Sequence, residues 1–397
     1  MFNEEAYALG ANRSCIRELF EYGRSRAAQI GAENVYDFSL GNPSIPAPAG
    51  VRDAIAQLLE DTDSVQLHGY TTAVGDLQTR QAIAEDLNCR FGTDITADEL
   101  FIGCGAAPEL CAVFKALTFP GAKILALAPY FPEYKPFVES AGAVFQAVAP
   151  DVPDFQINLS ELEKCLTADT AAVIVNSPNN PSGTVYTENT LKQLAALLER
   201  KSEAFGHPIY IVADEPYREL VYGGVTAPFI PSIYRNTLVC YSYSKSLSLP
   251  GERIGYIYVP RLSDDADKLY LAVAGAARSL GHVCAPSLWQ KVIARCARLR
   301  PDLQAYDKNR TALYEGLLAA GYEVARPAGA FYLFVKAPGG DANAFSQFAK
   351  EKDILLVPGD GFGCPGWFRL CYCVSYGQIT RSLPVFRALF EQWKQRK

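Results

Sequence analysis

The fold class of this 397-residue chain follows from one stretch, IYIVADEPY, which runs from Ile209 to Tyr217. Its first five residues are all apolar or aromatic, and no polar residue alternates with them. That pattern is typical of a β-strand covered on both faces. Asp214 directly follows this run. Because open α/β sheets bind ligands at the carboxyl ends of their strands, the sequence predicts that Asp214 faces a ligand crevice.

Similar apolar runs recur on both sides of this stretch, and amphipathic segments such as Thr190–Arg200 separate them. Strands that alternate with helices imply a largely parallel sheet. The sequence therefore predicts an α/β fold, in which a large domain has a mostly parallel, seven-stranded sheet covered by helices. The other six strands are expected at Leu100–Gly103, Lys123–Ala128, Ala143–Val148, Ala171–Asn176, Leu238–Ser244 and Ile254–Val259.

The C-terminal third has a different pattern and predicts a smaller α+β domain. The segment up to Pro46 lacks a clean sheet pattern, and we expect it to pack on that smaller domain as an arm. The predicted divisions are an arm (1–46), a large domain (47–290) and a small domain (291–397). Within the small domain we expect helices at Pro301–Leu318, Asn343–Lys352 and Gln378–Gln395, and strands at Ala330–Val335, Ile354–Val357 and Phe368–Val374.

The composition argues against several classes of protein. Lys and Arg total 37 against 43 Asp and Glu, a net charge of −6, so there is no basic surplus for nucleic-acid phosphates. No apolar run approaches the roughly 18 residues that span a bilayer, and residues 1–13 do not resemble a signal peptide. We expect a cytoplasmic protein that binds neither nucleic acid nor membranes. Eleven cysteines without a C-x-x-C pair and three histidines favour reduced thiols over a zinc site.

A small polar loop, SYSKS at residues 242–246, contains Lys245. A lysine at the end of an apolar strand is partly desolvated, which lowers its pKa and frees a nucleophilic amine. Arg253 follows eight residues later, and its guanidinium can hold a phosphate together with the loop hydroxyls. Taken alone, Lys245 also fits an ordinary surface lysine.

Asp214 and Tyr217 offer a second set of polar groups. The carboxylate of Asp214 can pair with a protonated ring nitrogen, and the hydroxyl of Tyr217 can donate to a phenolate oxygen. In isolation Asp214 fits a helix N-cap equally well.

A third segment, NSPNNPSG at residues 176–183, again follows a predicted strand. Its Asn180 can offer an amide to a ligand oxygen, although these residue types also form plain turns.

The loop GCGAAPE at residues 103–109 is expected to open a helix, where free backbone N–H groups bind phosphate. Small-residue loops of this kind also occur in nucleotide and S-adenosylmethionine binders. Those proteins have an acidic residue at the end of the next strand, which holds ribose hydroxyls. Residues 126–131, ALAPYF, contain no acid, so a methyltransferase is a distant alternative.

In their order and spacing these segments resemble the class I/II aminotransferases, which are fold-type I pyridoxal-phosphate enzymes of the aspartate aminotransferase type. The resemblance covers nearly the whole chain. It also includes SLGNP at 39–43, HGYT at 68–71, PYFP at 129–132, PAGAFY at 327–332 and FRL at 368–370.

The resemblance implies that the chain binds pyridoxal 5′-phosphate. Lys245 would form a Schiff base with the cofactor aldehyde and later move a proton between substrate Cα and the cofactor. Asp214 would keep the pyridine nitrogen protonated, so that the ring accepts electrons. Asn180 and Tyr217 would hold the 3′ oxygen, and Phe131 would stack on the ring. The phosphate would be bound by Gly105, Ala106, Ala107, Ser242 and Arg253.

The resemblance further implies how the substrate is bound and how subunits associate. Arg369 would bind the substrate α-carboxylate as a bidentate fork, with Asn180 and the Gly41 backbone beside it. Tyr70 matches a tyrosine that reaches the cofactor phosphate of a partner subunit, so a homodimer is expected. The implied activity is a ping-pong transfer of the amino group of an L-amino acid to a 2-oxo acid.

Several questions stay open at this stage. A C–S lyase of the same fold uses the same cofactor for β-elimination and differs by needing no 2-oxo acid acceptor. An aminotransferase-like module of a transcription regulator is not favoured, because only about 40 residues precede Gly41 and the chain has no basic surplus. Arg278 is a candidate cation for a second substrate carboxylate. Asp360, expected on the substrate side, is a candidate acid that would disfavour acidic side chains or attract basic ones.

Overall fold

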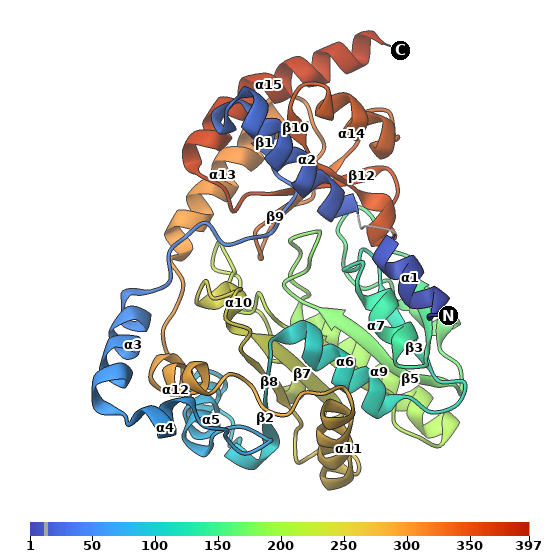
Figure 1. The fold of residues 1–397 in the computed structure, drawn as a ribbon. Helices are drawn as coiled ribbons and strands as arrows, with labels where there is room; N and C mark the ends of the chain where they lie inside the picture. The colour runs from blue at the N-terminus through green and yellow to red at the C-terminus, as the bar shows by residue number, and fades with distance from the viewer. Residues whose placement is uncertain (12–14, 397) are drawn as a thin grey trace.

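The computed structural model describes residues 1–11 and 15–396. In Figure 1 a large sheet with its helices occupies the lower part of the molecule, and a smaller unit, formed mainly by the C-terminal third, lies above it. The large sheet has seven strands in the order β2-β8-β7-β6-β5-β3-β4. Its strands are β2 (Leu100–Gly103), β3 (Lys123–Leu127), β4 (Val144–Val148), β5 (Thr170–Asn176), β6 (Tyr210–Asp214), β7 (Thr237–Ser242) and β8 (Gly255–Tyr258).

The strand directions confirm the predicted α/β fold with a mostly parallel seven-stranded sheet. From β7 through β6, β5 and β3 to β4, every neighbouring pair is parallel. β8 pairs antiparallel with both β7 and β2. The parallel strands therefore bring their carboxyl ends to one edge of the sheet, which is where ligands bind in such folds.

Alternate residues of the central strands pack on opposite faces of this sheet. Val212 and Leu238 belong to a core with the helices of one face, whereas Ile211 and Val239 belong to the core of the other. This burial on both faces explains why the strands read as continuous apolar runs. The first face is covered by α6 (Ala106–Leu117), α7 (Tyr134–Ser140) and α11 (Ala266–Ser279), and the second by α3 (Ala49–Asp61), α5 (Leu77–Phe91), α9 (Glu188–Phe205) and α12 (Ser287–Cys296).

The strand predicted at Leu238–Ser244 is shorter in the structure and ends at Ser242. The Ser242 hydroxyl caps the next element by accepting a hydrogen bond from the backbone N–H of Ser244, at 3.2 Å. That element is a short helix, α10 (Tyr243–Ser246). Lys245 therefore lies on a capped helical turn and not on an irregular loop.

The small unit has an antiparallel three-stranded sheet in the order β11-β12-β9. The segment predicted as one strand, Ile354–Val357, is two strands with different partners. Its first part, β10, pairs with β1 of the N-terminal segment, and its second part, β11, pairs with β12. The elements are β1 (Tyr36–Asp37), β9 (Tyr332–Lys336), β10 (Ile354–Leu355), β11 (Val357–Pro358), β12 (Trp367–Cys371), α13 (Leu303–Ala319), α14 (Ala342–Lys350) and α15 (Tyr376–Gln395).

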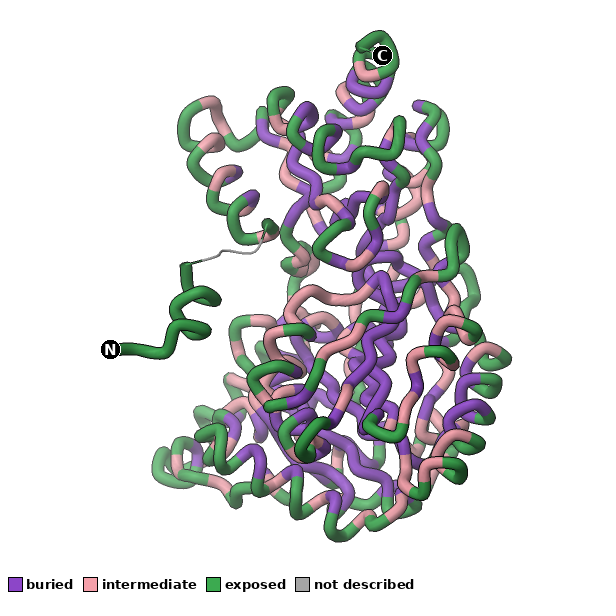
Figure 2. The backbone as a smooth tube through the Cα atoms, turned by 90° about the vertical axis from the view of Figure 1, so that its right-hand side faces the viewer, coloured by how far each residue is buried: buried purple, intermediate pink, exposed green. Residues whose placement is uncertain are grey.

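The N-terminal helices differ in how they pack. α2 (Cys15–Ile30) buries Leu19 in a core cluster with residues of the small unit. α1 (Glu4–Ala11) has no buried residue. In Figure 2 α1 lies apart from the rest of the chain, at the end marked N. A helix with no apolar face packed on its own subunit gains little stability from tertiary contacts.

The domain divisions after residues 46 and 290 stay a prediction. Residue 290 lies inside α12, and Val292 and Ile293 of that helix pack in the core of the large sheet. This packing favours an end of the large unit beyond α12. The remaining short helices are α4 (Ser64–His68), α8 (Leu159–Cys165) and the 3₁₀ turns η1 (Ala32–Asn34), η2 (Ala97–Glu99), η3 (Ile230–Ser232) and η4 (Gly359–Phe362). In the part of the chain that the structure describes, no helix has the length and apolarity to cross a membrane.

The packing of β7 yields a testable prediction. Leu238 is fully buried, so Leu238→Ala is expected to lower the free energy of unfolding by about 2–5 kcal/mol through lost burial and a cavity. Denaturant unfolding measures the effect. The control Leu262→Ala, at a residue 72% exposed, is expected to change stability by less than about 0.5 kcal/mol. Equal effects of the two changes would contradict the assignment of Leu238 to the core.

Candidate active site

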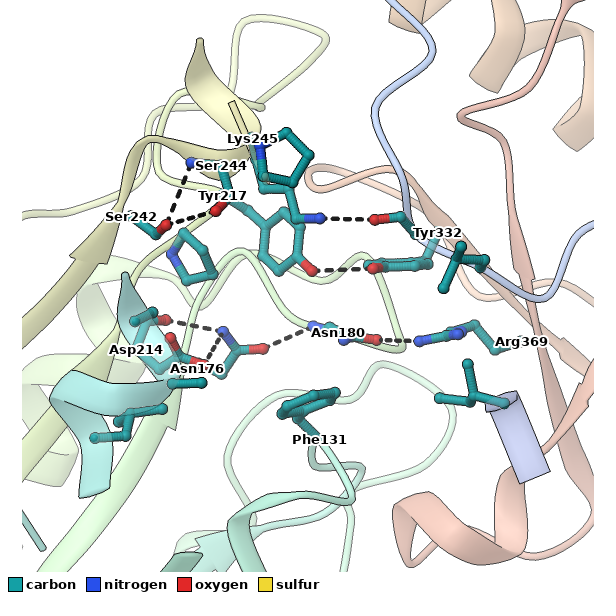
Figure 3. A pocket seen from close by; sticks show the side chains of 18 of the residues that line it. Phe131, Asn176, Asn180, Asp214, Tyr217, Ser242, Ser244, Lys245, Tyr332 and Arg369 are labelled. Atoms are coloured by element: carbon teal, nitrogen blue, oxygen red, sulfur yellow. Dashed lines mark hydrogen bonds between the residues drawn. The ribbon is translucent and has the colours of Figure 1, made fainter. Parts of the chain in front are cut away.

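A cavity of about 320 Å³ lies where the carboxyl edge of the large sheet meets the small unit. Figure 3 shows its side chains, which come from both units and point toward one another. The structure brings together most of the residues that the sequence singled out. Those that line the cavity are Gly41, Ala106, Ala107, Phe131, Asn180, Asp214, Tyr217, Ser242, Lys245, Arg253 and Arg369.

Lys245 projects from α10 across the cavity toward the segment that enters from the N-terminal side. Its Nζ donates a hydrogen bond to the carbonyl oxygen of Gly41, at 2.6 Å, and lies 5.3 Å from the centre of the Phe331 ring. Burial lowers the pKa of the Lys245 amine. A lowered pKa increases the share of neutral amine, which is the nucleophilic form.

Asp214 ends β6 beside Asn176, the last residue of the neighbouring strand β5. The Asn176 side-chain amide donates to the main-chain oxygen of Asp214 at 2.8 Å and to its Oδ2 at 3.4 Å. The Tyr134 hydroxyl also donates to Oδ2. Burial raises the pKa of Asp214 to about 7, although the hydrogen bond from Tyr134 acts in the opposite direction. Its other oxygen, Oδ1, is buried and accepts no hydrogen bond within the described residues.

The chemistry of Asp214 fits a pyridoxal ring. A protonated pyridine nitrogen is a charged N–H donor, and a buried carboxylate oxygen without a protein donor is its natural acceptor. Such a pair also restores the negative charge of the carboxyl, because an opposite charge favours the ionised form. Phe131 lines the same cavity and can cover one face of the ring.

The loop before α6 forms an anion-binding corner with Ser242 and Arg253. Gly105 has a φ of +92°, and a Cβ there would lie 2.8 Å from Nη2 of Arg253 and 3.3 Å from Oγ of Ser242. Only glycine therefore leaves room between the loop and the guanidinium. Ala106 and Ala107 begin the twelve-residue helix α6 and line the cavity. Free N–H groups at a helix start, a hydroxyl and a guanidinium together suit a phosphate.

Arg369 lies on β12, opposite the large sheet, and is only 2% exposed. Its Nη1 donates to Oδ1 of Asn180 at 2.9 Å, and its Nη2 donates to the carbonyl of Ser39 at 2.6 Å. Nε has no hydrogen-bond partner within the described residues. The guanidinium also lies over the Tyr332 ring, 4.6 Å from its centre. A buried guanidinium held only by neutral oxygens retains its full positive charge for a carboxylate ligand.

Three functional residues were missed by the sequence analysis. Asn176 and Tyr134 bind Asp214, and the Tyr332 hydroxyl lies 2.9 Å from that of Tyr217. Two of the three could have been found from the sequence. Asn176, like Asp214, is the polar residue at the end of a predicted strand, and Tyr332 belongs to the PAGAFY segment. No local pattern marks Tyr134, because it reaches Asp214 only through the packing of α7 on the sheet.

Three other residues lie outside the cavity. Tyr70 is 90% exposed and does not line the cavity of its own subunit. Arg278, near the end of α11, and Asp360, in η4, are also exposed and do not line it. The expectation that Asp360 lies on the substrate side therefore finds no support in the cavity of one chain. Gly105 lies next to the cavity, against Arg253 and Ser242.

Comparison with known proteins agrees with this site. Residues 33–384 match the family model of aminotransferase class I and II. The chain belongs to this family. It is 30% identical to a Thermotoga maritima protein named aspartate aminotransferase, over 91% of this chain and 92% of the other. It is 26% identical to aromatic-amino-acid aminotransferase 2 of Thermococcus litoralis, over 96% and 97% of the two chains. An aminotransferase crystal structure from Eubacterium rectale superposes with a TM-score of 0.97 at 56% identity and covers 99% of both chains.

The enzyme is thus a pyridoxal-phosphate-dependent aminotransferase of the aspartate aminotransferase type, and its cofactor is pyridoxal 5′-phosphate. The family resemblance inferred from the sequence is confirmed. The family match replaces the methyltransferase alternative, because the small-residue loop before α6 lies within the residues that match the aminotransferase family.

Glu109 is a buried acid close to the anion-binding corner. The sequence analysis did not single it out. Its carboxyl packs against two glycines, because a Cβ at Gly103 would lie 2.7 Å from its Oε1 and one at Gly255 would lie 2.5 Å from it. Neither carboxyl oxygen has a hydrogen-bond partner within the described residues. Burial raises the pKa of Glu109 well above its ordinary value, and the Gly105 backbone and Arg253 oppose this shift only in part.

The raised pKa predicts a pH-dependent effect of Glu109→Gln on stability. The folded wild type holds this proton more tightly than the unfolded chain. The stability from this group is therefore full below the ordinary glutamate pKa and declines as the pH rises toward the raised value. Glutamine has no carboxyl proton to lose. The free energy of unfolding of the variant, measured with denaturant, is therefore expected to rise relative to that of wild type as the pH rises from about 5 to 9. Glu188→Gln, at an exposed residue of α9, is the control, and parallel curves for Glu109→Gln and wild type would contradict the assignment.

The anion-binding corner predicts that Gly105→Ala weakens binding of both pyridoxal phosphate and inorganic phosphate. An added methyl group would displace Arg253, and overpacking of this kind costs about 1–3 kcal/mol. That cost corresponds to roughly 5- to 150-fold in the dissociation constant, which calorimetry can measure. Gly121→Ala is a matched control, because Gly121 has a φ of +84° but open space around its Cβ position. Equal losses of phosphate affinity in the two variants would contradict the assignment of Gly105 to the anion-binding corner.

Proposed function

We propose that this enzyme transfers the amino group of an L-amino acid to a 2-oxo acid in a ping-pong cycle, with Lys245, Asp214 and Arg369 as its central residues. One observation carries the proposal. A partly buried amine, a buried carboxylate and a buried guanidinium all line the same cavity. Within the described residues, one oxygen of the carboxylate accepts no hydrogen bond and the guanidinium has no acidic partner. These are the three groups that a covalently held pyridoxal ring and an amino-acid carboxylate require.

Different residues of the cavity would bind different parts of the cofactor. Ala106, Ala107, Ser242 and Arg253 would hold its phosphate with Gly105, Phe131 would stack on the ring, Asp214 would accept from the ring nitrogen, and Asn180 and Tyr217 would bind the 3′ oxygen. When bound, pyridoxal phosphate supplies an electron sink that stabilises negative charge at the substrate Cα.

Lys245 has two roles in this proposal. Its Nζ would hold the cofactor through its aldehyde in the resting enzyme and, with substrate bound, would accept the proton from the substrate Cα. The lowered pKa of Lys245 suits the second role, because a general base is most effective when its pKa is close to the working pH. The Gly41 carbonyl, 2.6 Å from Nζ, orients the amine on the side where the substrate backbone binds.

Arg369 binds the substrate α-carboxylate in this proposal, and Asn180 orients it. The hydrogen bond from Nη1 to Asn180 and the contact with the Tyr332 ring restrict the guanidinium to one plane. A planar guanidinium in a fixed orientation binds a carboxylate through two parallel hydrogen bonds. The amino group of the substrate is then directed toward Lys245.

The side-chain part of the substrate meets a largely apolar opening. Among the described residues, the cations that line the cavity are Lys245, Arg253 and Arg369, and each already has a role. Ile16 and Leu40 also line it. One subunit therefore offers no further cation for a second carboxylate, so we propose that it recognises the α-carboxylate and leaves the side chain to apolar contacts. Similar enzymes carry the names of both aspartate and aromatic-amino-acid aminotransferases.

A homodimer completes the proposal. Tyr70 is 90% exposed and so is free to reach the phosphate site of a second subunit, as the family resemblance implies. A cation for a dicarboxylic substrate would then also come from that subunit. The cytoplasmic location expected from the sequence stays a prediction.

The deciding experiment follows the colour of the enzyme purified with pyridoxal phosphate. Amino donors, with L-aspartate and L-phenylalanine among them, are expected to bleach the yellow colour, and 2-oxoglutarate to restore it. Lys245→Ala cannot form the Schiff base, so any yellow colour of this variant comes from cofactor that is held without it. Bleaching of that colour by a donor is expected to be slower than in wild type by roughly 10²- to 10⁴-fold, the usual contribution of a general base. Faster bleaching by phenylalanine than by aspartate would support the apolar opening.

Two outcomes would count against the proposal. Accumulation of pyruvate and ammonia over many turnovers without a 2-oxo acid would identify a C–S lyase. Unchanged bleaching in Lys245→Ala would remove Lys245 from the reaction. Lys192→Ala is a suitable control, because Lys192 is an exposed residue of α9 that pairs only with Glu188.

A further inference from the structure

Cys371 and Cys373 form a dithiol next to the proposed substrate site. Their Sγ atoms lie 2.7 Å apart, and both side chains are buried. All eleven cysteines of the chain lie within the described residues, and none forms a disulfide. None of the roles proposed above uses either thiol.

The dithiol shares a face of its strand with Arg369. Arg369 and Cys371 are alternate residues of β12 and so point to the same side. Cys373 lies two residues past the last residue of the strand, and its Sγ contact with Cys371 places it at the end of the same row. This row contacts the segment from Phe38 to Gly41. Arg369 donates to the Ser39 carbonyl at 2.6 Å, the backbone N–H of Cys371 donates to Phe38 at 2.8 Å, and the Cys373 thiol lies 3.9 Å from the Leu40 carbonyl.

The same segment also holds Lys245, whose Nζ donates to the Gly41 carbonyl. A displacement of the dithiol therefore reaches both the carboxylate-binding arginine and the reactive lysine through one short stretch of backbone. Leu40, whose carbonyl the Cys373 thiol contacts, lines the cavity and is 38% exposed.

The two thiols are not equivalent. Burial by itself would raise the pKa of Cys371, but the hydrogen bond with Cys373 and the nearby Arg369 and Lys245 cations outweigh it and lower this pKa. Burial raises the pKa of Cys373. One thiol is thus prepared to act as a thiolate nucleophile while the other retains its proton, which is the arrangement found in reactive cysteine pairs.

We propose that Cys371 and Cys373 are a modification site at which a peroxide reversibly forms an intramolecular disulfide and so weakens binding of the substrate carboxylate at Arg369. The effect on substrate rests on the function proposed for Arg369, whereas the disulfide itself does not.

The chemistry requires only peroxide. The Cys371 thiol first releases its proton, the resulting thiolate attacks one peroxide oxygen, and the O–O bond breaks. The hydroxide that leaves takes up the released proton and becomes water. The Cys371 sulfenic acid then reacts with the Cys373 thiol, so that an S–S bond forms and a second water leaves. Two thiols are oxidised to one disulfide, and one peroxide is reduced to two waters.

Closing this bond shortens the distance between the two Sγ atoms from 2.7 Å to about 2.05 Å. Cα atoms two residues apart in an extended chain are about 6.6–6.8 Å apart, at the upper end of the range for bridged cysteines, so the bond pulls the two residues together. The residue between them, Tyr372, resists this contraction, because its N–H and hydroxyl donate to the carbonyls of Phe331 and Ala330, each at 2.9 Å. The strain is therefore passed along the strand to Arg369 and across to the Phe38–Gly41 segment.

Peroxide treatment of the holoenzyme tests the proposal. After the remaining thiols are blocked in denaturant, mass spectrometry of the peptide that contains both residues is expected to show a loss of two hydrogens. The KM for the amino donor is expected to rise about tenfold or more, with a smaller change in kcat, because a charge-assisted hydrogen bond to a carboxylate contributes that much. Dithiothreitol is expected to reverse both changes.

Variants separate the dithiol from other cysteines. Cys371→Ser and Cys373→Ser are each expected to abolish the mass change and the reversible rise in KM, compared with the same variant before treatment. Cys89→Ser, at an exposed residue of α5, is expected to respond like wild type.

Three results would overturn the proposal: free thiols at both residues after treatment, a disulfide that leaves the KM unchanged, or a KM effect that is lost in a variant at the exposed Cys15 instead. Failure of the amino-transfer assignment would appear separately, as a yellow enzyme that no amino donor bleaches. The mass change would still report on the dithiol.

Discussion

One row of hydrogen bonds crosses the cavity, and the rest of the site depends on it. It runs from Asp214 to Asn176, from Asn176 to the backbone N–H of Asn180, and from the Asn180 side chain to Arg369 (Figure 3). Its first members end strands of the large sheet, and its last member lies on β12 of the small unit. The row therefore sets the distance between Asp214, which we propose faces the cofactor, and Arg369, which we propose faces the substrate.

Burial gives these groups their chemical properties. In water Asp214 would be an ordinary carboxylate and Lys245 an ordinary ammonium group. At the edge of a sheet covered on both faces, burial raises the pKa of Asp214 and lowers that of Lys245. The fold thus prepares an acid that needs a cationic partner and an amine that is ready to react. The same low polarity would strengthen the binding of a carboxylate that we propose for Arg369, because the guanidinium is buried.

The Phe38–Gly41 segment forms hydrogen bonds with residues of both units. It accepts hydrogen bonds from Lys245 of the large unit and from Arg369 and Cys371 of the small unit. A change on either side can reach the other through a few backbone carbonyls. In our proposal this arrangement makes the carboxylate site at Arg369 sensitive to a change at the two thiols, which contact the same segment. It also explains why Gly41 has no side chain, since a Cβ there would lie 2.1 Å from the Tyr332 hydroxyl.

Local sequence determined the strands of the large sheet and most of the cavity residues, because continuous apolar runs and the polar residues that follow them are local patterns. The identity of Lys245, Asp214, Asn180 and Arg369 as site residues followed from those patterns and the family resemblance. Only the tertiary structure decided that Tyr134 and Tyr332 join them, that β8 runs antiparallel and that Cys371 and Cys373 lie beside the substrate site. These contacts join residues from separate elements, and their geometry depends on how those elements pack, which no local pattern encodes.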